Sequence, residues 1–396
     1  MNSFKVGITG QAGFMGTHLF NFLGLKKDVE RIPFADDFFS SKETLDDFVK
    51  QCDVIVHLAA MNRHGNPQVI YDTNLSLVKN ILESCDRTNS KPHILFSSST
   101  QEERDNLYGK SKLEGRLLFE KWAKENNTDF TALIIPNVFG PFGNPYYNSV
   151  IATFSHQLTH DEEPRIEIDG ELKLIYIHEL VEEFWEKMVE TGGKVEKGNG
   201  EKVKEVSGRA EEWKSGKVER YEVPFTYEIQ VSEILNLLKN YKELYFEKGI
   251  IPTLYNRFEL NLFNTFRSYF PNEKFPFLLK ENVDERGSFV EIIRTNTSGQ
   301  YSYSTTKPGI TRGNHFHTRK IERFAVIKGQ AEIALRRIGT DEIITCLLDG
   351  KNPAFVDMPI WYTHNITNSG KEELITLFWI NEPYDANDPD TFFEKV

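Results

Sequence analysis

The sequence predicts an α/β domain with a doubly wound parallel sheet, followed by an all-β sandwich or barrel. Short apolar strands alternate with helical stretches over residues 1–140, and a glycine-rich turn follows the first of these strands. After Val283 the pattern changes to short alternating strands with glycine and proline turns. A chain of 396 residues also exceeds the size of about 250–300 residues at which a single core stops growing. We therefore expect two domains, residues 1–278 and 279–396.

In the first domain, the predicted elements alternate as parallel strands and crossover helices must. Strands are expected over 4–9, 54–58, 94–97 and 131–136, and helices over 15–25, 72–85 and 109–125, where apolar residues recur every three or four positions. Residues 225–272 are predicted to be mostly helical. We expect the aromatic-rich run 241–277 to form interdomain packing. The segment at about 192–222 is rich in Gly, Lys and Glu, which is typical of a charged, solvated hairpin or mobile insertion.

Composition excludes several classes of function. The net charge of −12 disfavours nucleic-acid binding, which requires a basic face. The three cysteines show neither metal-site nor redox spacing, which indicates a reducing compartment. The N-terminus leads directly into a strand pattern, without a signal peptide or a long apolar run. We expect a cytoplasmic protein that contacts neither nucleic acid nor membrane.

The first candidate site is the glycine-rich turn between the first strand and the first helix. Its glycines allow a tight turn, a close approach of the backbone to a pyrophosphate and close helix–strand packing, while the helix N-terminus attracts the phosphates. This placement predicts dinucleotide binding rather than a purely structural turn. The expected cofactor-binding residues of this turn are Gly10, Gly13, Phe14, Met15 and Gly16.

A second signal is the spacing of Tyr108 and Lys112, which follow the serine run that ends the strand at 94–97. Residues four apart share one helix face, so the lysine charge can lower the pKa of the phenol. Such a phenol can pass a proton to a carbonyl oxygen while a nicotinamide supplies hydride. Ser99 is the predicted hydroxyl that orients the carbonyl, with Ser98 and Thr100 as rivals.

Together these motifs resemble the extended short-chain dehydrogenases, whose members mostly act on nucleotide sugars. The likeness covers about the first 185 residues. The resemblance implies a Rossmann-type fold, with Tyr108 as proton donor and Lys112 as its activator and a ribose ligand. It also implies that Leu58, Ala59 and Pro136 line the cofactor and that Asn137 and Asn148 contact the substrate. For the two asparagines, helix capping is the alternative.

The cofactor's ribose should contact residues about 20 positions after the glycine turn. Asp36 or Asp37 would favour NADH, whereas Arg31 would favour NADPH. The resemblance favours NADPH, with NADH left open.

The second candidate site combines three histidines and one glutamate. Alternate residues His315 and His317 point the same way from one strand, Glu322 follows on the next, and His364 comes much later. Three imidazoles and one carboxylate suit zinc or another divalent metal with an exchangeable ligand. The alternative is that these are surface or hydrogen-bonded core histidines.

The strands around these residues, with turns at Gly329 and Pro359, resemble the cupin family, which implies a cupin barrel. The stretches 284–289 and 302–315 further resemble the dTDP-4-dehydrorhamnose 3,5-epimerases, cupins that move a proton beside a sugar ketone. Arg286, Lys307 and Arg312 are therefore candidates to neutralise diphosphate or enolate charge, although each could also be an ordinary surface cation. The proton-transferring base is left unassigned.

The order of the two halves resembles bifunctional enzymes of bacterial capsular polysaccharide synthesis that make UDP-2-acetamido-2,6-dideoxy-L-talose. That resemblance implies a homodimer that binds a UDP-sugar. The cupin would epimerise C3 of a UDP-4-keto-6-deoxy-HexNAc, and the reductase would then reduce C4. Two alternatives are a single-activity nucleotide-sugar enzyme with a structural cupin, and a non-catalytic nucleotide sensor, which would need neither Tyr108 nor Lys112.

Overall fold

A computed structural model describes residues 4–191, 216–279, 281–284, 287–290, 299–382 and 385–396. By their contacts, the residues divide into two compact units. The first comprises residues 1–139 and 172–228, and the second comprises 140–171 and 229–396. The predicted boundary at 278/279 lies inside the second unit. As the start of the all-β domain, it stays a prediction.

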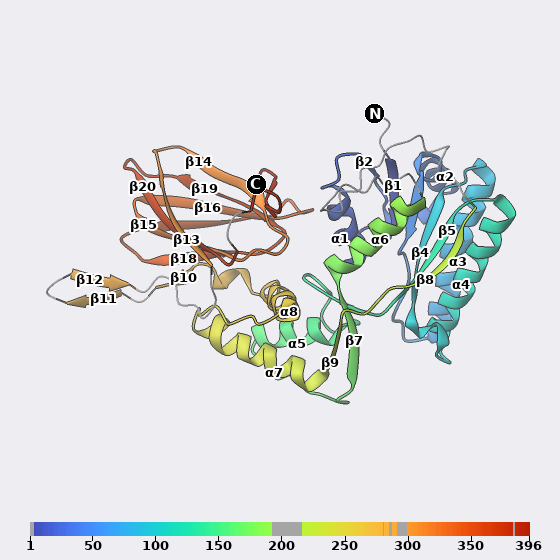
Figure 1. Ribbon diagram of the computed structural model, residues 1–396, viewed down its shortest axis with the longest axis horizontal. Coiled ribbons are helices and arrows are strands. Elements are labelled where there is room, and N and C mark those ends of the chain that lie inside the picture. The colour runs from blue at the N-terminus through green and yellow to red at the C-terminus, as the bar shows by residue number, and fades with distance from the viewer. Residues whose placement is uncertain (1–3, 192–215, 280, 285–286, 291–298, 383–384) are drawn as a thin grey trace. The chain divides into compact units, whose positions relative to one another are not determined.

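The first unit is built on a six-stranded parallel sheet with helices on both faces (Figure 1). Such a sheet is buried on both sides, and accordingly every residue of the strand over residues 130–135 is buried. In the order β2-β1-β3-β4-β5-β8, the strands are β1 (Phe4–Thr9), β2 (Val29–Ile32), β3 (Val54–His57), β4 (His93–Ser99), β5 (Phe130–Ile135) and β8 (Val218–Glu222). This confirms the predicted doubly wound parallel sheet.

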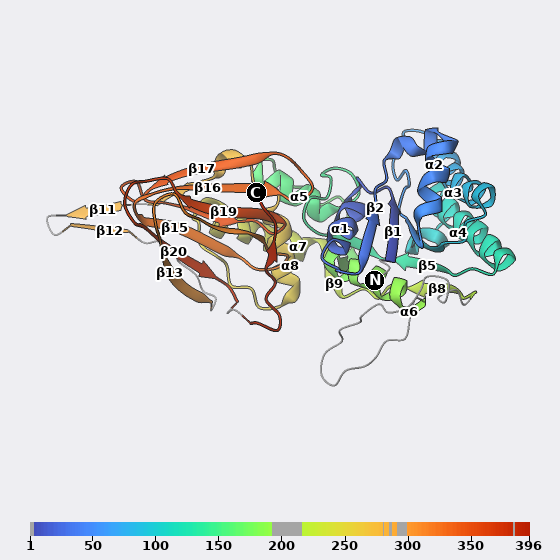
Figure 2. The ribbon, with the colours of Figure 1, turned by 90° about the horizontal axis from the view of Figure 1, so that it is seen from above.

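The helices of this unit are α1 (Phe14–Leu23), α2 (Lys42–Gln51), α3 (Pro67–Thr88), α4 (Leu107–Asn126) and α6 (Ile177–Thr191). Figure 2 shows α2, α3 and α4 on one face of the sheet and α1 on the other. A second, small sheet has the order β6-β7-β9, with β6 (Asn137–Phe139), β7 (Glu171–Tyr176) and β9 (Tyr227–Gln230). Two short 3₁₀ helices, η1 (Asp36–Ser40) and η2 (Thr100–Glu103), follow β2 and β4.

The prediction for the charged segment at about 192–222 was wrong at its end, where residues 218–222 form β8 and pair with β5. A strand at a sheet edge needs a backbone partner on one side only, so its side chains can stay charged and exposed. Residues 192–215 of that segment lie outside the described residues.

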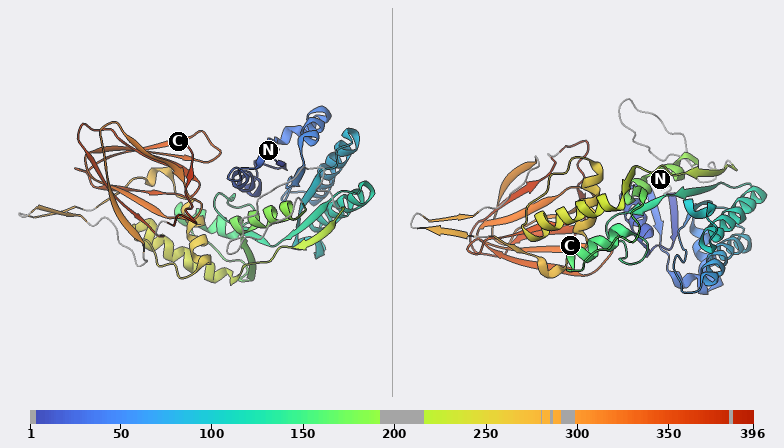
Figure 3. Two further views of the ribbon diagram at one scale, coloured as in Figure 1. Left: turned by 45° about the horizontal axis from the view of Figure 1, so that its top comes forward. Right: turned by 90° about the horizontal axis from the view of Figure 1, so that it is seen from below.

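In its described residues, the second unit contains three α-helices, α5 (Val150–Thr159), α7 (Val231–Tyr241) and α8 (Arg257–Arg267), and a π-helical turn, η4 (Lys242–Glu247). The 3₁₀ helix η5 (Asn272–Lys274) follows α8. Figure 3 shows these helices beside the strands of the same unit. The mostly helical prediction for 225–272 is thus confirmed. The aromatic run packs within the second unit, where the rings of Phe277 and Phe355 stack with centroids 5.0 Å apart, and its assignment as interdomain packing stays a prediction.

The C-terminal strands form two five-stranded antiparallel sheets and a hairpin. One sheet has the order β10-β18-β15-β20-β13, with β10 (Phe277–Leu278), β13 (Gln300–Thr306), β15 (Glu322–Lys328), β18 (Ala354–Met358) and β20 (Leu374–Ile380). The other has the order β17-β16-β19-β14-β21, with β14 (Thr311–Phe316), β16 (Gln330–Arg337), β17 (Ile343–Asp349), β19 (Tyr362–Asn368) and β21 (Phe392–Phe393). The hairpin joins β11 (Glu281–Asp284) to β12 (Gly287–Val290).

Between these sheets lies an apolar core that includes Ile333, Leu335 and Val356, all nearly inaccessible to solvent. Across the described residues the strand pairings give two sheets rather than one closed barrel. The prediction of an all-β C-terminal region is confirmed, but its closure into a barrel is not. Within the described ranges, no helix is long and apolar enough to cross a membrane.

Candidate functional site

The glycine-rich turn leads from β1 into the N-terminus of α1, as the sequence predicts. Gly10 has a left-handed φ of +69°, and Gly13 is the N-cap of α1 without a side-chain cap. A Cβ atom at Gly16 would lie 2.2 Å from the backbone oxygen of Gly10, so only glycine fits there. Phe14 and Met15 form the first turn of α1. The uncapped amide groups of this turn can therefore bind a phosphate.

The candidate ribose-binding residues follow β2. Asp36 and Asp37 are exposed at the start of η1. Arg31 lies on β2, where its guanidinium stacks over the Phe20 ring at 4.3 Å and donates a hydrogen bond to the Phe20 carbonyl at 3.1 Å. Arg31 thus packs against Phe20 and Gly24 at the C-terminal end of α1 rather than at the glycine turn.

Lys112 is the most constrained member of the predicted catalytic group. Its side chain is buried on α4, and its Nζ donates to the Ser97 carbonyl at 2.9 Å. The same Nζ lies 5.8 Å from the centre of the Tyr108 ring. Burial lowers the pKa of Lys112 to about 8, although the charge of Glu102 acts in the opposite direction. The two side chains thus share one helix face, as their spacing predicts.

The three candidate hydroxyls at the end of β4 have different surroundings. Ser98 is buried and donates to the carboxylate of Glu102, while Thr100 is exposed. Ser99 is half-buried, and its Oγ accepts a hydrogen bond from the Gln101 amide at 3.2 Å. Among the described residues its own proton has no recorded acceptor, which fits the role predicted for Ser99.

Sequence reasoning missed Glu102, whose buried carboxylate accepts from Ser98 and from Arg116 Nε at 3.0 Å. Its charge raises the pKa of Lys112, which ties it to the predicted catalytic group. Nothing in the run Gln101-Glu102-Glu103-Arg104 separates this buried glutamate from its exposed neighbours. Only the fold of η2 against α4 turns it inward.

The other residues matched to the dehydrogenase pattern lie around β3 and β5. Asn74 of α3 ties the Met61 backbone to the Ser111 hydroxyl, which fixes the loop after β3 against α4. Leu58 and Ala59 begin that loop, next to Gly10. Pro136 is buried after β5.

Neither candidate substrate asparagine is a helix cap. Asn137 is exposed on β6 and donates to the Lys173 carbonyl at 3.3 Å. Asn148 is exposed just before α5, whose N-cap is Ser149. The two asparagines belong to different units.

In the second unit, the four predicted metal ligands meet. One ligand atom from each of His315, His317, Glu322 and His364 lies within 4.8 Å of the others. Their positions come from β14, the loop after it, β15 and β19. A bulge in β14 at Gly313 and Asn314 brings the strand against β19, where a Cβ at Gly313 would lie 2.9 Å from the His364 carbonyl. Glycine at this position therefore permits the approach.

The ligand atoms of the cluster point toward one another. Glu322 Oε2 lies 2.9 Å from His317 Nε2 and 3.2 Å from His364 Nε2. All three atoms are buried, yet among the described residues none has a partner with hydrogen-bond geometry. Buried polar atoms are rarely left so. The arrangement fits a divalent cation bound between them.

The outer ring nitrogens support the same assignment. His317 Nδ1 donates to the Asp390 carbonyl at 2.5 Å, and His364 Nδ1 donates to the Tyr362 carbonyl at 3.3 Å. In a neutral imidazole, these bonds leave the lone pair on Nε2, where a metal would bind.

Charges within the cluster shift its protonation. Burial, followed by the neighbouring His364 and His317, lowers the pKa of His315 to about 4. Burial would raise the pKa of Glu322, but His317 and His364 outweigh it and lower that pKa below its usual range. A neutral His315 and an ionised Glu322 are the forms that ligate a metal.

Two of the basic side chains predicted to contact the substrate lie on and near β14. Lys307 is exposed after β13, and Arg312 is exposed on β14, three residues before His315. Arg312 donates to the Thr305 carbonyl at 3.0 Å. Arg286 lies outside the described residues.

Two family models match the chain. Residues 6–195 match the NAD dependent epimerase/dehydratase family. Residues 282–392 match the polysaccharide biosynthesis C-terminal domain. The first match contains the glycine turn and the Tyr108–Lys112 pair, and the second contains the whole histidine cluster.

Some of the similar proteins span nearly the whole chain. A UDP-2-acetamido-2,6-beta-L-arabino-hexul-4-ose reductase of Pseudomonas aeruginosa is 30% identical, with 98% of each chain covered. The crystal structure of the capsular polysaccharide assembling protein CapF of Staphylococcus aureus is 35% identical, covers 100% of both chains and has a TM-score of 0.58. A UDP-glucose 4-epimerase of Thermotoga maritima is 18% identical over 67% of this chain and 98% of its own, with a TM-score of 0.51, and shows the shared fold alone. The chain therefore belongs to the CapF family of capsular polysaccharide biosynthesis enzymes.

Proposed function

We propose that this protein is a bifunctional nucleotide-sugar enzyme of capsule or O-antigen precursor synthesis. Its C-terminal domain, a cupin over residues 279–396, epimerises C3 of a UDP-4-keto-6-deoxy-HexNAc. The N-terminal domain then reduces the C4 ketone with NADPH, which yields a precursor of the UDP-L-FucNAc pathway. Support comes from the CapF family membership and from two separate sets of chemically suited residues.

The observation that carries the reductase is the buried Lys112 beside the Tyr108 ring, in a unit whose glycine turn can bind a dinucleotide. Tyr108 donates its phenolic proton to the C4 oxygen, and Ser99 holds that oxygen by a hydrogen bond. Lys112 stabilises the resulting phenolate and binds the cofactor ribose. The nicotinamide, when bound, supplies the hydride.

Reaction at C3 requires removal of a proton next to the ketone. His315, His317, Glu322 and His364 would hold a divalent metal, zinc in the first instance, and such a metal would supply Lewis-acid stabilisation of the ketone and enolate charge. Lys307 and Arg312, together with Arg286, would neutralise the remaining negative charge of the substrate. Asn137 and Asn148 would bind the sugar and the nucleotide.

A direct assay tests the whole proposal. The purified protein is incubated with a UDP-4-keto-6-deoxy-HexNAc and NADPH in deuterated water, and the product is analysed by NMR. We expect loss of the reduced-nicotinamide absorbance, deuterium at C3 and a product inverted at that carbon. Reduction without deuterium at C3 would show that the protein is a reductase whose C-terminal domain has only a structural role. The predicted homodimer is checked on the same sample by sedimentation.

A further inference from the structure

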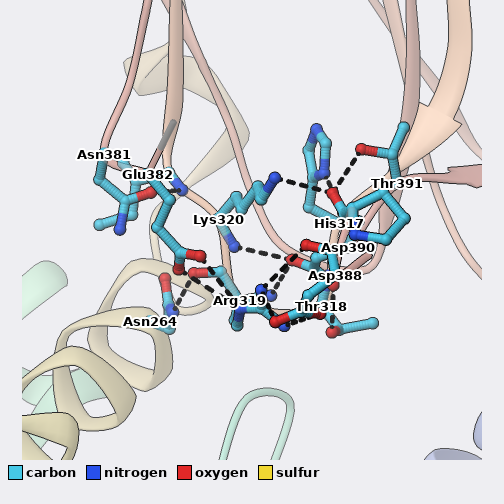
Figure 4. Close-up of polar contacts among 12 residues, drawn as sticks. Asn264, His317, Thr318, Arg319, Lys320, Asn381, Glu382, Asp388, Asp390 and Thr391 are labelled. Carbon is cyan, nitrogen blue, oxygen red and sulfur yellow. Dashed lines mark hydrogen bonds and ion pairs between the residues drawn. The ribbon is translucent and has the colours of Figure 1, made fainter. Parts of the chain in front are cut away.

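The loop between β14 and β15 connects two of the candidate metal ligands. His317 stands at its start and Glu322 at its end, with only four residues between them. Residues 388–390, close to the C-terminal end of the chain, bind this loop through hydrogen bonds and an ion pair (Figure 4). The position of the loop therefore depends on a segment about 70 residues away in sequence.

Asp390 makes most of these contacts. Its carboxylate is almost fully buried, with 3% of the residue exposed. One carboxylate oxygen accepts from the Thr318 amide at 3.1 Å and from the Thr318 hydroxyl at 2.6 Å. The other accepts from the amides of Arg319 at 3.0 Å and Lys320 at 3.2 Å. One carboxylate thus binds three successive backbone N–H groups of the loop.

The backbone of the same residue contacts a ligand directly. The carbonyl oxygen of Asp390 accepts the hydrogen bond from His317 Nδ1 at 2.5 Å. Asp390 has a left-handed φ of +39°, a conformation that aspartate and asparagine tolerate better than other residues with a side chain. Lys320 adds a hydrogen bond from its Nζ to the Pro389 carbonyl at 2.7 Å. The side chain therefore fixes the loop, while the carbonyl fixes the imidazole.

We propose that Asp390 is a positioning residue of the metal site. By holding the loop and the His317 ring together, it keeps the Nδ1–H tautomer and directs Nε2 toward Glu322. This inference rests on the proposed metal site and adds a role for a residue that touches no metal. Groups that orient a ligating histidine in this way change metal affinity by about 10–100-fold when they are replaced.

The chain offers a matched control two residues away. Asp388 belongs to the same segment and also binds Arg319, through the guanidinium at 2.7 Å. Its side chain is 65% exposed and makes no contact with the backbone N–H groups that Asp390 binds. Loss of an exposed ion pair of this kind has little effect. Asp388→Asn therefore removes the same charge from the same segment without freeing His317.

The experiment measures zinc affinity of the full chain by competition with a chromophoric chelator. In Asp390→Asn, the amide retains the size and the backbone preference of aspartate but turns a donor toward at least one of these N–H groups in either orientation. We expect zinc to bind about 10–100-fold more weakly to this variant. Asp388→Asn should bind zinc like the unchanged protein. Equal affinity in Asp390→Asn and the unchanged protein would overturn the inference.

Thermal unfolding of the metal-free proteins separates positioning from plain stability. If Asp390→Asn unfolds at a lower temperature without metal but retains full zinc affinity, the residue is only structural. Thr318→Val, which removes one donor to Asp390, should weaken zinc binding less than Asp390→Asn and serves if that variant does not fold. His317→Ala tests the underlying site: if it retains zinc, the metal site itself is rejected, whatever Asp390→Asn does.

Discussion

Two buried histidine environments show what distinguishes a ligand cluster from a core histidine. His57, at the end of β3, has an Nε2 atom without a hydrogen-bond partner in the described part of the chain, as do His317 and His364. Its Nδ1 bonds to Thr9 Oγ1 at 2.8 Å, and its ring lies against Phe96 and Phe119. Burial, followed by the charge of Lys112, lowers the pKa of His57 to about 3.

Burial among aromatic rings explains a neutral His57, and none of the described residues offers a second ligand beside it. In the C-terminal unit, by contrast, unpartnered atoms of two imidazoles face the same carboxylate oxygen. A single unpaired nitrogen therefore indicates burial, whereas several that converge indicate a cation. The comparison also predicts that the two units depend on different chemistry, which substitutions in one unit at a time can test.

The largest effect is expected at the histidine cluster. His317→Ala removes one of four ligands, so bound metal measured by elemental analysis should be lost. Deuterium exchange at the carbon next to the substrate ketone should disappear with it. NADPH binding should persist, because the glycine turn belongs to the other unit. A variant that keeps both metal and exchange would show that the histidines are structural, like His57.

The reciprocal change is Tyr108→Phe, which removes only the transferable proton. NADPH oxidation should fall by about 10²-fold or more, while NADPH affinity and deuterium exchange are unchanged. Stopped-flow absorbance measures NADPH oxidation, and NMR measures deuterium exchange. Unchanged turnover would reject Tyr108 as the acid, and loss of exchange would show that the two sites are not independent.

A smaller effect is expected from pH. Because burial lowers the pKa of Lys112 to about 8, its ammonium loses its proton as pH rises through that value. The charged ammonium donates stronger hydrogen bonds to the ribose than the neutral amine does, so NADPH affinity should weaken above about pH 8. Titration by fluorescence checks this. In Lys112→Met, binding should be weak at all pH values between about 7 and 9.5, since the titrating group is absent. Equal pH dependence in both proteins would assign the effect to another group.

The smallest effect concerns cofactor choice. We expect a higher kcat/KM with NADPH than with NADH. Arg31 packs against the C-terminal end of α1, and its contact with the Phe20 carbonyl competes with a phosphate, so the preference should be modest. The preference is measured as the ratio of kcat/KM with NADPH to kcat/KM with NADH, in the unchanged protein and in Arg31→Ala. A clear preference for NADH would show that Asp36 and Asp37 outweigh Arg31.

How much the sequence could predict depended on how local the determinants are. The strand over 4–9 is confirmed with both ends, because apolar residues and the glycine turn mark it directly. The helix predicted over 72–85 runs from 67 to 88, because Asn66 caps it, Pro67 fits its first turn, and Asn89 ends it in a left-handed conformation. The short strand β2 was missed, since only Ile32 of its four residues is buried.

The site residues also could be predicted only where their determinants are local. The spacings within Gly10–Gly16 and between Tyr108 and Lys112 lie within one turn or one helix, so the sequence predicted them. Glu102 and Asp390 were not predicted, because their roles arise from segments distant in sequence that pack together. The residue type gives no indication of whether a carboxylate will be solvated or will bind three backbone amides.

One buried ion pair links the C-terminal strands of the second unit to its helical segment. Arg323 and Asp357, both 1% exposed, form an ion pair at 2.8 Å. The helical segment completes it, since Tyr245 donates to Asp357 and the Gly249 carbonyl accepts from Arg323 at 2.9 Å. Shortening the protein to residues 279–396 would remove both partners and expose this pair together with Phe355. An isolated C-terminal fragment should therefore aggregate, and gene truncations that include α7 and α8 should express better than those that begin at the strands.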